Sequence, residues 1–374
     1  MFPLGEEWCG VYLHIPFCRS KCDYCDFLSF PNVPRSEMES YVERLVCEME
    51  DRIPRAMEGF SRFTLYLGGG TPTVLPHDLL KRILEKSCCL LPELEEITVE
   101  TNPFAVDGDL VSLFEDYGVS RVSLGIQSLS QKILKALGRR ATVKEGLKAL
   151  EVLADRRFTL SVDLIYGAPR QRCEDLLHDL EILMDFGPAH ISAYSLTLED
   201  NTPLRRAVEA GRVTMPSEEQ WAEQFETVRG FLQDRGYTHY EISNFAKDGS
   251  YCLHNLIYWS NGSYLGLGVG AVSHIGDRRW GNTDTLGEYL KGDFSPQWEE
   301  RLPTLQKAAE TAILMLRTRW GVPASHPVTC HREVRERLEH LSRQGLLAFN
   351  GHSWVIPSPL LPVANEVMVQ LIPD

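Results

Sequence analysis

The chain has 374 residues, of which 52 are acidic and 38 are basic, so its formal net charge is −14. This charge disfavours a nucleic-acid backbone as partner. No apolar run is long enough to cross a bilayer, and the first residues lack the basic and apolar regions of a signal peptide. The ten cysteines are scattered, unlike a secreted disulfide framework. We therefore expect a cytoplasmic protein without a transmembrane helix, built from one large and one smaller domain.

Short apolar runs alternate with amphipathic helical patterns over the first two thirds of the chain. The predicted strands are 11–15, 63–67, 96–100, 121–126, 159–165 and 191–196. The predicted helices are 36–52, 77–91, 107–117, 142–156, 173–186 and 217–235. Apolar strands separated by helices indicate a parallel sheet covered by helices. Six such units are too few for a closed eight-fold barrel, so we predict an α/β fold with an open, partial (β/α)6 barrel.

The pattern changes after residue 235. Residues 240–245 predict a strand outside the repeat, and the glycine-spaced apolar stretch 266–274 allows close backbone packing. Glycine and proline interrupt the pattern between 292 and 302. The predicted domains are a barrel over 1–235, a connector over 236–295 and a C-terminal domain over 296–374.

The last segment predicts an α+β domain that is winged-helix-like. Helices are expected over 305–319 and 331–343, and Asn350-Gly351 between apolar runs predicts a hairpin. The second helix is rich in arginine, which raises DNA binding as a possibility. Glutamates alternate with these arginines and the whole chain is acidic, so we interpret the helix as a solvated face.

Three cysteines, Cys18, Cys22 and Cys25, lie within eight residues directly after the first predicted strand. Thiolates are soft ligands that suit zinc, copper(I) or an iron–sulfur cluster. Structural zinc sites usually close with four ligands, whereas no fourth Cys or His follows this CxxxCxxC spacing nearby, and Phe27 stands two residues after Cys25. Three thiolates on a four-iron cluster would leave one iron open to a ligand. A zinc knuckle or a chance grouping of small buried residues is the alternative.

Other polar residues stand where predicted strands end, which is where ligands bind in such folds. Gly69, Gly70 and Thr71 follow the second strand, and glycine amides can approach a ligand closely. Glu100 ends the third strand and could accept from a ribose hydroxyl or an ammonium, or be a solvated loop charge. Asp163 lies inside an apolar strand and therefore needs a partner, either a structural hydrogen bond or a cofactor.

The segment Tyr12 to Cys25, YLHIPFCRSKCDYC, resembles the signature of the radical S-adenosylmethionine (AdoMet) superfamily. Its LHIPFC lead-in resembles the branch that contains oxygen-independent coproporphyrinogen III oxidase and the HemW heme chaperones. The resemblance implies a [4Fe–4S] cluster on Cys18, Cys22 and Cys25, with AdoMet on the fourth iron. The AdoMet-binding residues that it implies are Tyr12, Tyr24, Gly69, Gly70, Thr71, Glu100, Gln127, Arg139 and Asp163.

A second motif follows the strand predicted over 240–245. Its residues are His254, Asn255, Tyr258 and Trp259. Imidazole can take an axial position on heme iron while Tyr and Trp cover the ring, although a histidine beside aromatic residues is more often part of a packed core. This HNxxYW sequence resembles the heme-binding motif of the HemW subgroup, which implies heme as a further cofactor. The motif leaves the axial ligand open among His254, Cys252 and His274.

Two functions of this branch compete. An oxidase would abstract hydrogen from a porphyrinogen propionate and release CO2, in porphyrin biosynthesis. Oxidases carry a further cysteine two residues after the triplet, where this chain has Phe27. With the HNxxYW motif, this favours a heme chaperone, and we expect coproporphyrinogen III dehydrogenase activity to be absent while AdoMet cleavage stays open.

The partners implied are heme, heme-accepting (respiratory) proteins and an electron donor such as ferredoxin or flavodoxin. No nucleic-acid partner is expected, and peripheral association with a membrane is compatible with the sequence. A DNA regulator that uses the cluster as a redox sensor would leave the residues at the strand ends unexplained.

Overall fold

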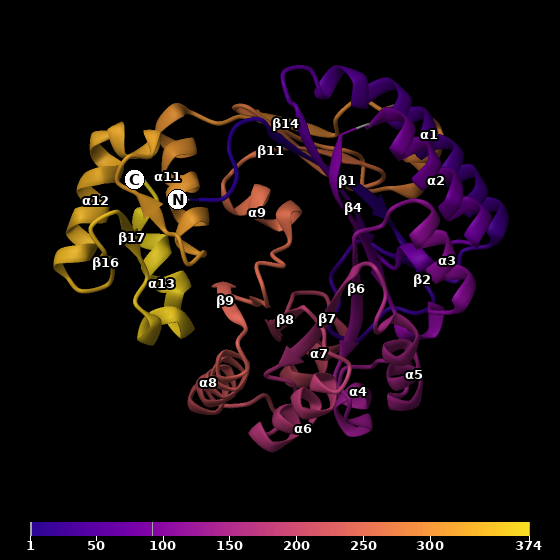
Figure 1. The fold of residues 1–374 in the computed structure, drawn as a ribbon, viewed down its shortest axis with the longest axis horizontal. Coiled ribbons are helices and arrows are strands. Elements are labelled where there is room, and N and C mark those ends of the chain that lie inside the picture. Colours follow the sequence, from indigo (N-terminus) through magenta and orange to yellow (C-terminus); the bar gives the residue numbers. More distant parts are fainter. Residues whose placement is uncertain (1, 92, 293, 374) are drawn as a thin grey trace.

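The computed structural model describes residues 2–91, 93–292 and 294–373; Met1 and Asp374, at the ends of the predicted outer domains, lie outside them. Its centre is a sheet in which the six predicted strands lie side by side and parallel (Figure 1). In spatial order they are β1 (Trp8–Ile15), β4 (Arg62–Gly69), β5 (Leu94–Thr101), β6 (Arg121–Gln127), β7 (Thr159–Tyr166) and β8 (His190–Ser195). The predicted partial (β/α)6 barrel is confirmed.

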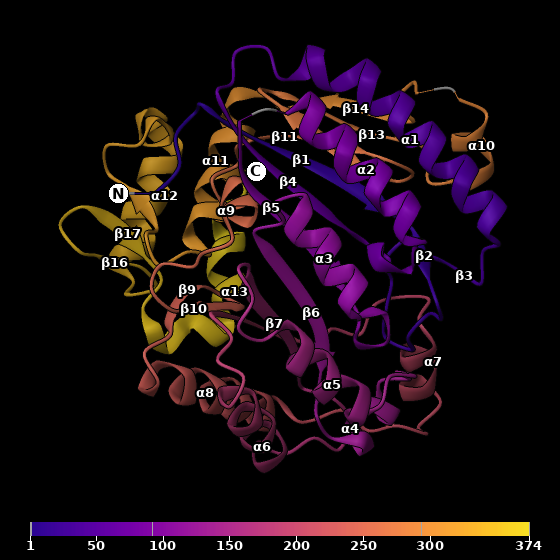
Figure 2. The same cartoon turned by 45° about the vertical axis from the view of Figure 1, so that its right-hand side comes forward.

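Helices run along the outside of this curved sheet (Figure 2). The six predicted ones are α1 (Arg35–Ala56), α2 (His77–Leu90), α3 (Gly108–Asp116), α5 (Val143–Leu153), α6 (Cys173–Met184) and α8 (Glu218–Asp234). Two of them begin with a capping box, in which Thr142 and Glu145, or Ser217 and Gln220, satisfy free N–H groups. The smaller elements are β2 (Phe17–Cys18), β3 (Phe30–Pro31), α4 (Gln131–Ala136), α7 (Pro203–Glu209) and the 3-10 turns η1 (Pro72–Val74) and η2 (Pro103–Ala105).

Residues after 235 extend the sheet at both edges. Next to β8 lie the antiparallel strands β10 (Asn244–Ala246) and β9 (Thr238–Glu241). Next to β1 lies the parallel strand β11 (Ser263–Leu267), followed by the antiparallel strands β12 (Val272–Ile275), β13 (Arg278–Gly281) and β14 (Trp298–Arg301). The short helix α10 (Leu286–Leu290) precedes β14.

The prediction of one continuous strand over 240–245 is wrong, because this segment turns and forms a hairpin of two short strands, β9 and β10. The Glu241 carboxylate accepts hydrogen bonds from the Ser243 N–H, at 3.0 Å, and from the Asn244 side chain. These bonds hold a turn between the two short strands, and both strands belong to the main sheet rather than to a separate element.

The two faces of the barrel strands differ in polarity. On β4, Leu65 and Leu67 belong to the apolar core on the helix-covered face. Thr64 and Tyr66 alternate with them and point into the barrel, since successive side chains of a strand face opposite ways. The interior of the barrel is therefore polar, and its side chains need hydrogen-bond partners or a ligand.

The C-terminal segment has a hydrophobic core of its own. Its elements are α11 (Thr304–Leu316), β15 (Val322–Pro323), η3 (Pro327–Cys330), α12 (Arg332–Arg343), β16 (Ala348–Phe349), β17 (Ser353–Val355), η4 (Ser358–Val363), α13 (Ala364–Met368) and η5 (Val369–Leu371). The hairpin predicted at Asn350-Gly351 is confirmed, since β16 and β17 pair across it. With β15 they form a three-stranded sheet beside the helices. None of the described helices has the length and hydropathy needed to cross a bilayer.

Three of the four arginines of α12 are paired with glutamates one helical turn away. The ion pairs are Arg332–Glu336 at 2.7 Å, Arg335–Glu339 at 2.9 Å and Arg337–Glu333 at 3.1 Å. The helix therefore presents mixed charge to solvent, as its sequence predicted, rather than a cationic surface for a phosphate backbone.

A buried carboxylate ties α1 to the extended edge of the sheet. Glu48 has no exposed surface, and it accepts hydrogen bonds from the Gly268 N–H at 2.9 Å, the Asn282 amide at 2.8 Å and the Tyr289 hydroxyl at 2.7 Å. Arg52, one turn along α1, lies 2.8 Å from the same carboxylate. This network joins residues that are more than 200 positions apart in the chain.

Replacing Glu48 should therefore destabilise the protein strongly. We expect Glu48→Ala to lower the free energy of unfolding by about 3 kcal/mol, because Arg52 and several buried donors lose their acceptor. Urea unfolding followed by circular dichroism measures this. The matched control is Glu50→Ala on the same helix, whose ion pair with Lys86 is exposed and should matter much less. Equal losses in the two variants would contradict the assigned role of Glu48.

Candidate functional site

A cavity of about 710 Å³ opens at the carboxyl ends of the barrel strands. Of the nine predicted AdoMet-binding residues, eight line it: Tyr24, Gly69, Gly70, Thr71, Glu100, Gln127, Arg139 and Asp163. The ninth, Tyr12, is not among the lining residues. Its ring lies behind that of Tyr66, with the centroids 6.2 Å apart, and its hydroxyl lies 3.0 Å from His14 Nδ1.

The three thiols of Cys18, Cys22 and Cys25 line the same cavity, and none of them is in a disulfide. Among the described residues no three His, Cys, Asp or Glu side chains converge on a position for one metal ion. A four-iron cluster instead binds each thiolate through a different iron and does not need them to converge on one point. No other Cys or His lies among the described lining residues, which fits a cluster with one open iron.

Burial affects the protonation of two of these thiols. It raises the pKa of Cys18, and it raises the pKa of Cys25 to about 11. Both groups are therefore neutral thiols at pH 7 in the metal-free protein. Binding of a metal centre to them would release protons.

A line of polar contacts connects the first two thiols. Cys18 Sγ lies 3.9 Å from the Thr71 hydroxyl, which accepts a hydrogen bond from the Asn102 amide at 2.6 Å. The side-chain Oδ1 of Asn102 accepts from Arg139 at 2.7 Å, and Arg139 also lies 3.8 Å from Cys22 Sγ. Asn102 was not among the predicted site residues; its position two residues after Glu100, at the end of β5, was the available signal.

Gln127 owes its position in the cavity to a β-bulge. The pairing of β6 with β7 shifts register between Gly125 and Gln127, and Gln127 has a φ of 65°. Bulges commonly redirect a side chain beside a binding site, and this left-handed conformation is uncommon for a residue other than glycine. The bulge brings Gln127 into the lining of the cavity.

Two carboxylates lie at the base of the cavity. Glu100 accepts hydrogen bonds from the Tyr66 hydroxyl at 2.8 Å and from the Gly69 N–H at 3.2 Å. Asp163 accepts from the Ser123 hydroxyl at 3.0 Å, which confirms the prediction that this residue has a partner. Burial raises the pKa of Glu100 to about 7 and that of Asp163 to about 6. Both groups can accept further hydrogen bonds from an ammonium or a hydroxyl of a ligand.

The predicted heme residues do not line this cavity. They lie on the short helix α9 (Leu253–Trp259), beneath the cavity floor. This helix was not predicted from the sequence. His254 is only 1% exposed, with Nδ1 2.8 Å from the Thr64 hydroxyl and Nε2 2.9 Å from the Tyr258 hydroxyl. Burial lowers the pKa of His254 to about 3, so the ring is neutral. Both of its nitrogens are engaged, and neither is free to bind iron in this conformation.

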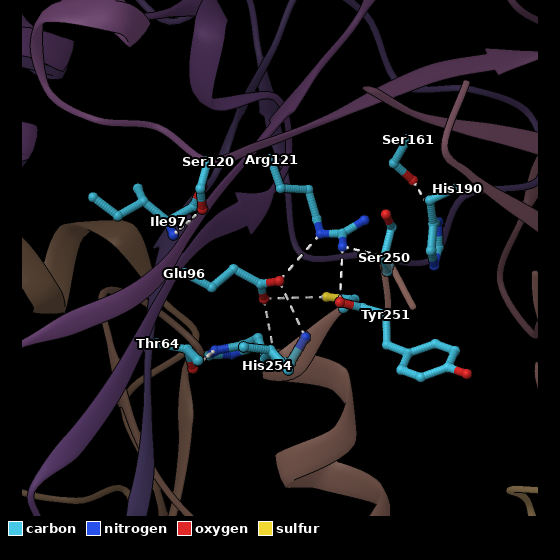
Figure 3. Close-up of polar contacts among 12 residues, drawn as sticks. Thr64, Glu96, Ile97, Ser120, Arg121, Ser161, His190, Ser250, Tyr251 and His254 are labelled. Carbon is cyan, nitrogen blue, oxygen red and sulfur yellow. Dashed lines mark hydrogen bonds and ion pairs between the residues drawn. The ribbon is translucent and has the colours of Figure 1, made fainter. Parts of the chain in front are cut away.

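A buried ion pair holds the start of α9 inside the barrel (Figure 3). Arg121 Nε lies 3.2 Å from the Glu96 carboxylate, which also accepts from the N–H groups of Leu253 and His254 at 3.1 and 3.0 Å. Arg121 in turn donates to the Tyr251 carbonyl at 2.8 Å. The chain before α9 and the helix itself are thus fixed to β5 and β6.

The remaining heme candidates lie around the same helix. Trp259 packs under the guanidinium of Arg317, which is 4.6 Å from its ring centroid, and Asn255 is half-buried. Of the two alternative axial ligands, Cys252 donates to Glu96 at 3.6 Å, and His274 on β12 is 1% exposed. Neither of them lines the cavity.

Comparison with known proteins identifies the family of this chain. The model of the radical SAM superfamily matches residues 12–183. The heme chaperone HemW of Mycobacterium tuberculosis (strain H37Rv) is 32% identical over 99% of this chain and 96% of its own length. The chain belongs to the HemW family of the radical SAM superfamily. Another HemW relative, from Lactococcus lactis, is 34% identical over 84% of this chain and 82% of its own length.

An animal protein is also similar to this chain. The mitochondrial radical S-adenosyl methionine domain-containing protein 1 of Mus musculus is 36% identical over 98% of this chain and 87% of its own length. Among solved structures, coproporphyrinogen III oxidase (HemN) from Escherichia coli matches with a TM-score of 0.81 over 98% of this chain and 90% of its own. Its sequence identity is 21%, so this match shows a common fold.

The Glu100 carboxylate at the base of the cavity should make the free energy of unfolding depend on pH. The pKa of Glu100 is about 7 in the folded protein against an ordinary value of 4.5, so the folded state keeps a proton that the unfolded state loses. The cofactor-free protein should therefore lose stability as pH rises through this interval. Glu100→Gln removes the effect, so the variant should gain stability relative to the parent between pH 5 and pH 8, by at most about 3 kcal/mol. Urea unfolding at both pH values tests this, and parallel pH profiles would contradict it.

Proposed function

We propose that this protein is a heme chaperone, which binds heme and delivers it to acceptor proteins such as respiratory enzymes. The observation that supports this best is its similarity to curated HemW heme chaperones over nearly the full length of both chains. The HNxxYW motif on α9 adds support from the chain itself. We place the protein in the cytoplasm, with ferredoxin or flavodoxin as the class of electron donor.

We further propose that Cys18, Cys22 and Cys25 hold a [4Fe–4S] cluster and that AdoMet occupies the adjoining cavity. When bound, the cluster would supply an open iron for AdoMet and an electron for its reductive cleavage. The residues of this chain would bind and orient the cofactor: Arg139 brings a positive charge beside Cys22, and Glu100 accepts from an ammonium or ribose hydroxyl.

Heme binding at the α9 motif requires a local rearrangement. His254 Nε2 is hydrogen-bonded to Tyr258, so coordination of iron through this atom means that the bond breaks and the two side chains separate. We assign the heme site to His254, Asn255, Tyr258 and Trp259 in such a rearranged state. Cys252 and His274 remain the alternative axial ligands.

The rival function is an oxygen-independent coproporphyrinogen III oxidase. Oxidases of this branch carry a cysteine at the position of Phe27, and here an apolar ring lines the cavity and is 66% exposed. The likeness to the Escherichia coli oxidase extends to the fold, at 21% identity. The chaperone function is therefore better supported.

Each of the three thiols should be required for the cluster. After anaerobic reconstitution, Cys18→Ala, Cys22→Ala and Cys25→Ala should each lose the iron, the sulfide and the visible absorption of the [4Fe–4S] cluster, because a cluster with only two thiolates is poorly held. The matched control is Cys47→Ala, an exposed cysteine on α1, which should keep all three signals. A full iron and sulfide content in any one of the three variants would remove that residue from the proposed ligand set.

A side-by-side assay should separate the two functions. Anaerobically reconstituted protein should bind hemin, seen as a Soret band in a titration, and should not convert coproporphyrinogen III when AdoMet and dithionite are supplied. Conversion of the porphyrinogen without heme uptake would establish the oxidase instead.

Within the same assay, His254→Ala should weaken heme binding and shift the Soret band. His190→Ala is the matched control, because His190 is equally buried in the barrel with both nitrogens bonded, to Ser161 and Tyr240, but lies outside the motif. An unchanged spectrum and affinity in His254→Ala would mean that Cys252 or His274 binds the iron. The variants Cys252→Ala and His274→Ala would then show which of the two is the ligand.

A further inference from the structure

Tyr66 lies between the two proposed ligand sites. Its ring lines the cavity, and its hydroxyl donates to Glu100 at 2.8 Å. The same ring packs on the imidazole of His254, with the centroids 5.1 Å apart and the planes at 34°. One side chain therefore contacts a predicted AdoMet-binding residue and a predicted heme-binding residue.

We propose that Tyr66 is a positioning residue that couples the two sites: a ligand held at Glu100 restrains Tyr66 and through it His254, so that AdoMet and heme each weaken the binding of the other. This inference rests on the proposed function, because it requires that both ligands bind. It adds a regulatory relation between them that neither site implies alone.

His254 has no room to turn within its present surroundings. Its Nδ1 and Nε2 are bonded to Thr64 and Tyr258, and Tyr66 covers one side of the ring. Gly10 of β1 lies so close that an added Cβ would be 3.0 Å from His254 Cε1. A close-packed side chain of this kind has discrete alternatives rather than a range of intermediate positions. To reach heme iron, the imidazole must leave this position, and it then loses its contact with Tyr66.

A ligand in the cavity acts on the other end of the same contact. Glu100 accepts one hydrogen bond from Gly69 and one from Tyr66, and a carboxylate can accept about four in all. An ammonium or hydroxyl group of the ligand can therefore bind Glu100 without displacing Tyr66. The added bond orders the Glu100 side chain, and the Tyr66 ring is then held more firmly against His254.

The rest of α9 offers few other routes for movement. Its first N–H groups are bound to Glu96, and its last residue packs against Arg317 of the C-terminal segment. Just beyond the helix, the Asn261 amide donates to the Thr311 hydroxyl at 3.0 Å. With both ends of the helix attached, the restraint on the His254 ring comes chiefly from its immediate neighbours, of which Tyr66 alone among the described residues also lines the cavity.

The test is a measurement of heme affinity with and without saturating AdoMet. It uses the full chain with its cluster reconstituted and kept oxidised, so that AdoMet is not cleaved, and hemin titrations followed at the Soret band. We expect AdoMet to weaken heme binding by at least about five-fold, the lower end of typical coupling between sites. Linkage requires that saturating heme weakens AdoMet binding by the same factor, which equilibrium filtration measures independently.

Tyr66→Phe isolates the hydroxyl that links the two sites. This variant keeps the ring on His254 and loses the bond to Glu100, so each ligand should bind alone while the coupling factor falls close to one. The matched control is Tyr194→Phe, a second tyrosine in the cavity lining, which should keep the five-fold coupling. Since Phe preserves the ring, a purely structural role of Tyr66 would leave the factor unchanged.

The outcomes are distinct. If both ligands bind but do not affect each other, or if AdoMet strengthens heme binding, the coupling is refuted and the chaperone function stands. If Tyr66→Phe keeps the full coupling, the assignment to Tyr66 is refuted. If the protein binds no heme in the absence of AdoMet, the proposed function fails and the inference fails with it.

Discussion

The interior of the barrel depends on one interaction, the ion pair between the Glu96 carboxylate and Arg121. The carboxylate is buried together with Arg121, and removing either partner would leave a charge without compensation in a poorly solvated place. The carboxylate also accepts from two N–H groups at the start of α9 and from the Cys252 thiol just before it. These bonds hold α9 inside the barrel, on the side of Tyr66 that faces away from the cavity. The helix therefore supports the floor of the cavity.

Polarity inside the barrel explains why a helix is needed there. In a barrel filled by apolar side chains the strands close on their own core, whereas here Thr64, Tyr66 and Asp163 point inward. Helix α9 supplies partners for the lower of these groups, since His254 binds Thr64. The upper groups, at the level of Glu100 and Asp163, border the cavity and keep acceptors available for a ligand.

The sequence predicted those parts of the structure that depend on local patterns. Alternation of apolar runs and helices was sufficient for the six parallel strands. The rule that ligands lie at strand ends placed the thiols near Glu100, and both line the cavity. Neighbours on adjacent parallel strands meet because their ends lie at one edge of the sheet. These features need no knowledge of how distant segments pack.

Features that depend on distant segments were not predicted. His254 meets Thr64 across 190 positions of the chain, and no local pattern signals that its helix enters the barrel. The addition of β11 beside β1 is of the same kind, because the strands pair across more than 250 residues. Asn102 and Tyr66 lie beside recognisable motifs and were still not predicted. Their roles depend on contacts that only the folded structure shows, between Asn102 and Arg139 and between Tyr66 and His254.

The contacts that tie the thiol-bearing loop to the barrel have an entropic consequence. A free loop that captures a metal centre must lose about 1–2 kcal/mol of backbone freedom for each residue that becomes ordered. Here Thr71 and Arg139 already hold positions beside Cys18 and Cys22, and both are anchored through Asn102. Part of that loss has therefore occurred during folding, and it no longer opposes metal binding, whereas deprotonation of the buried thiols still does.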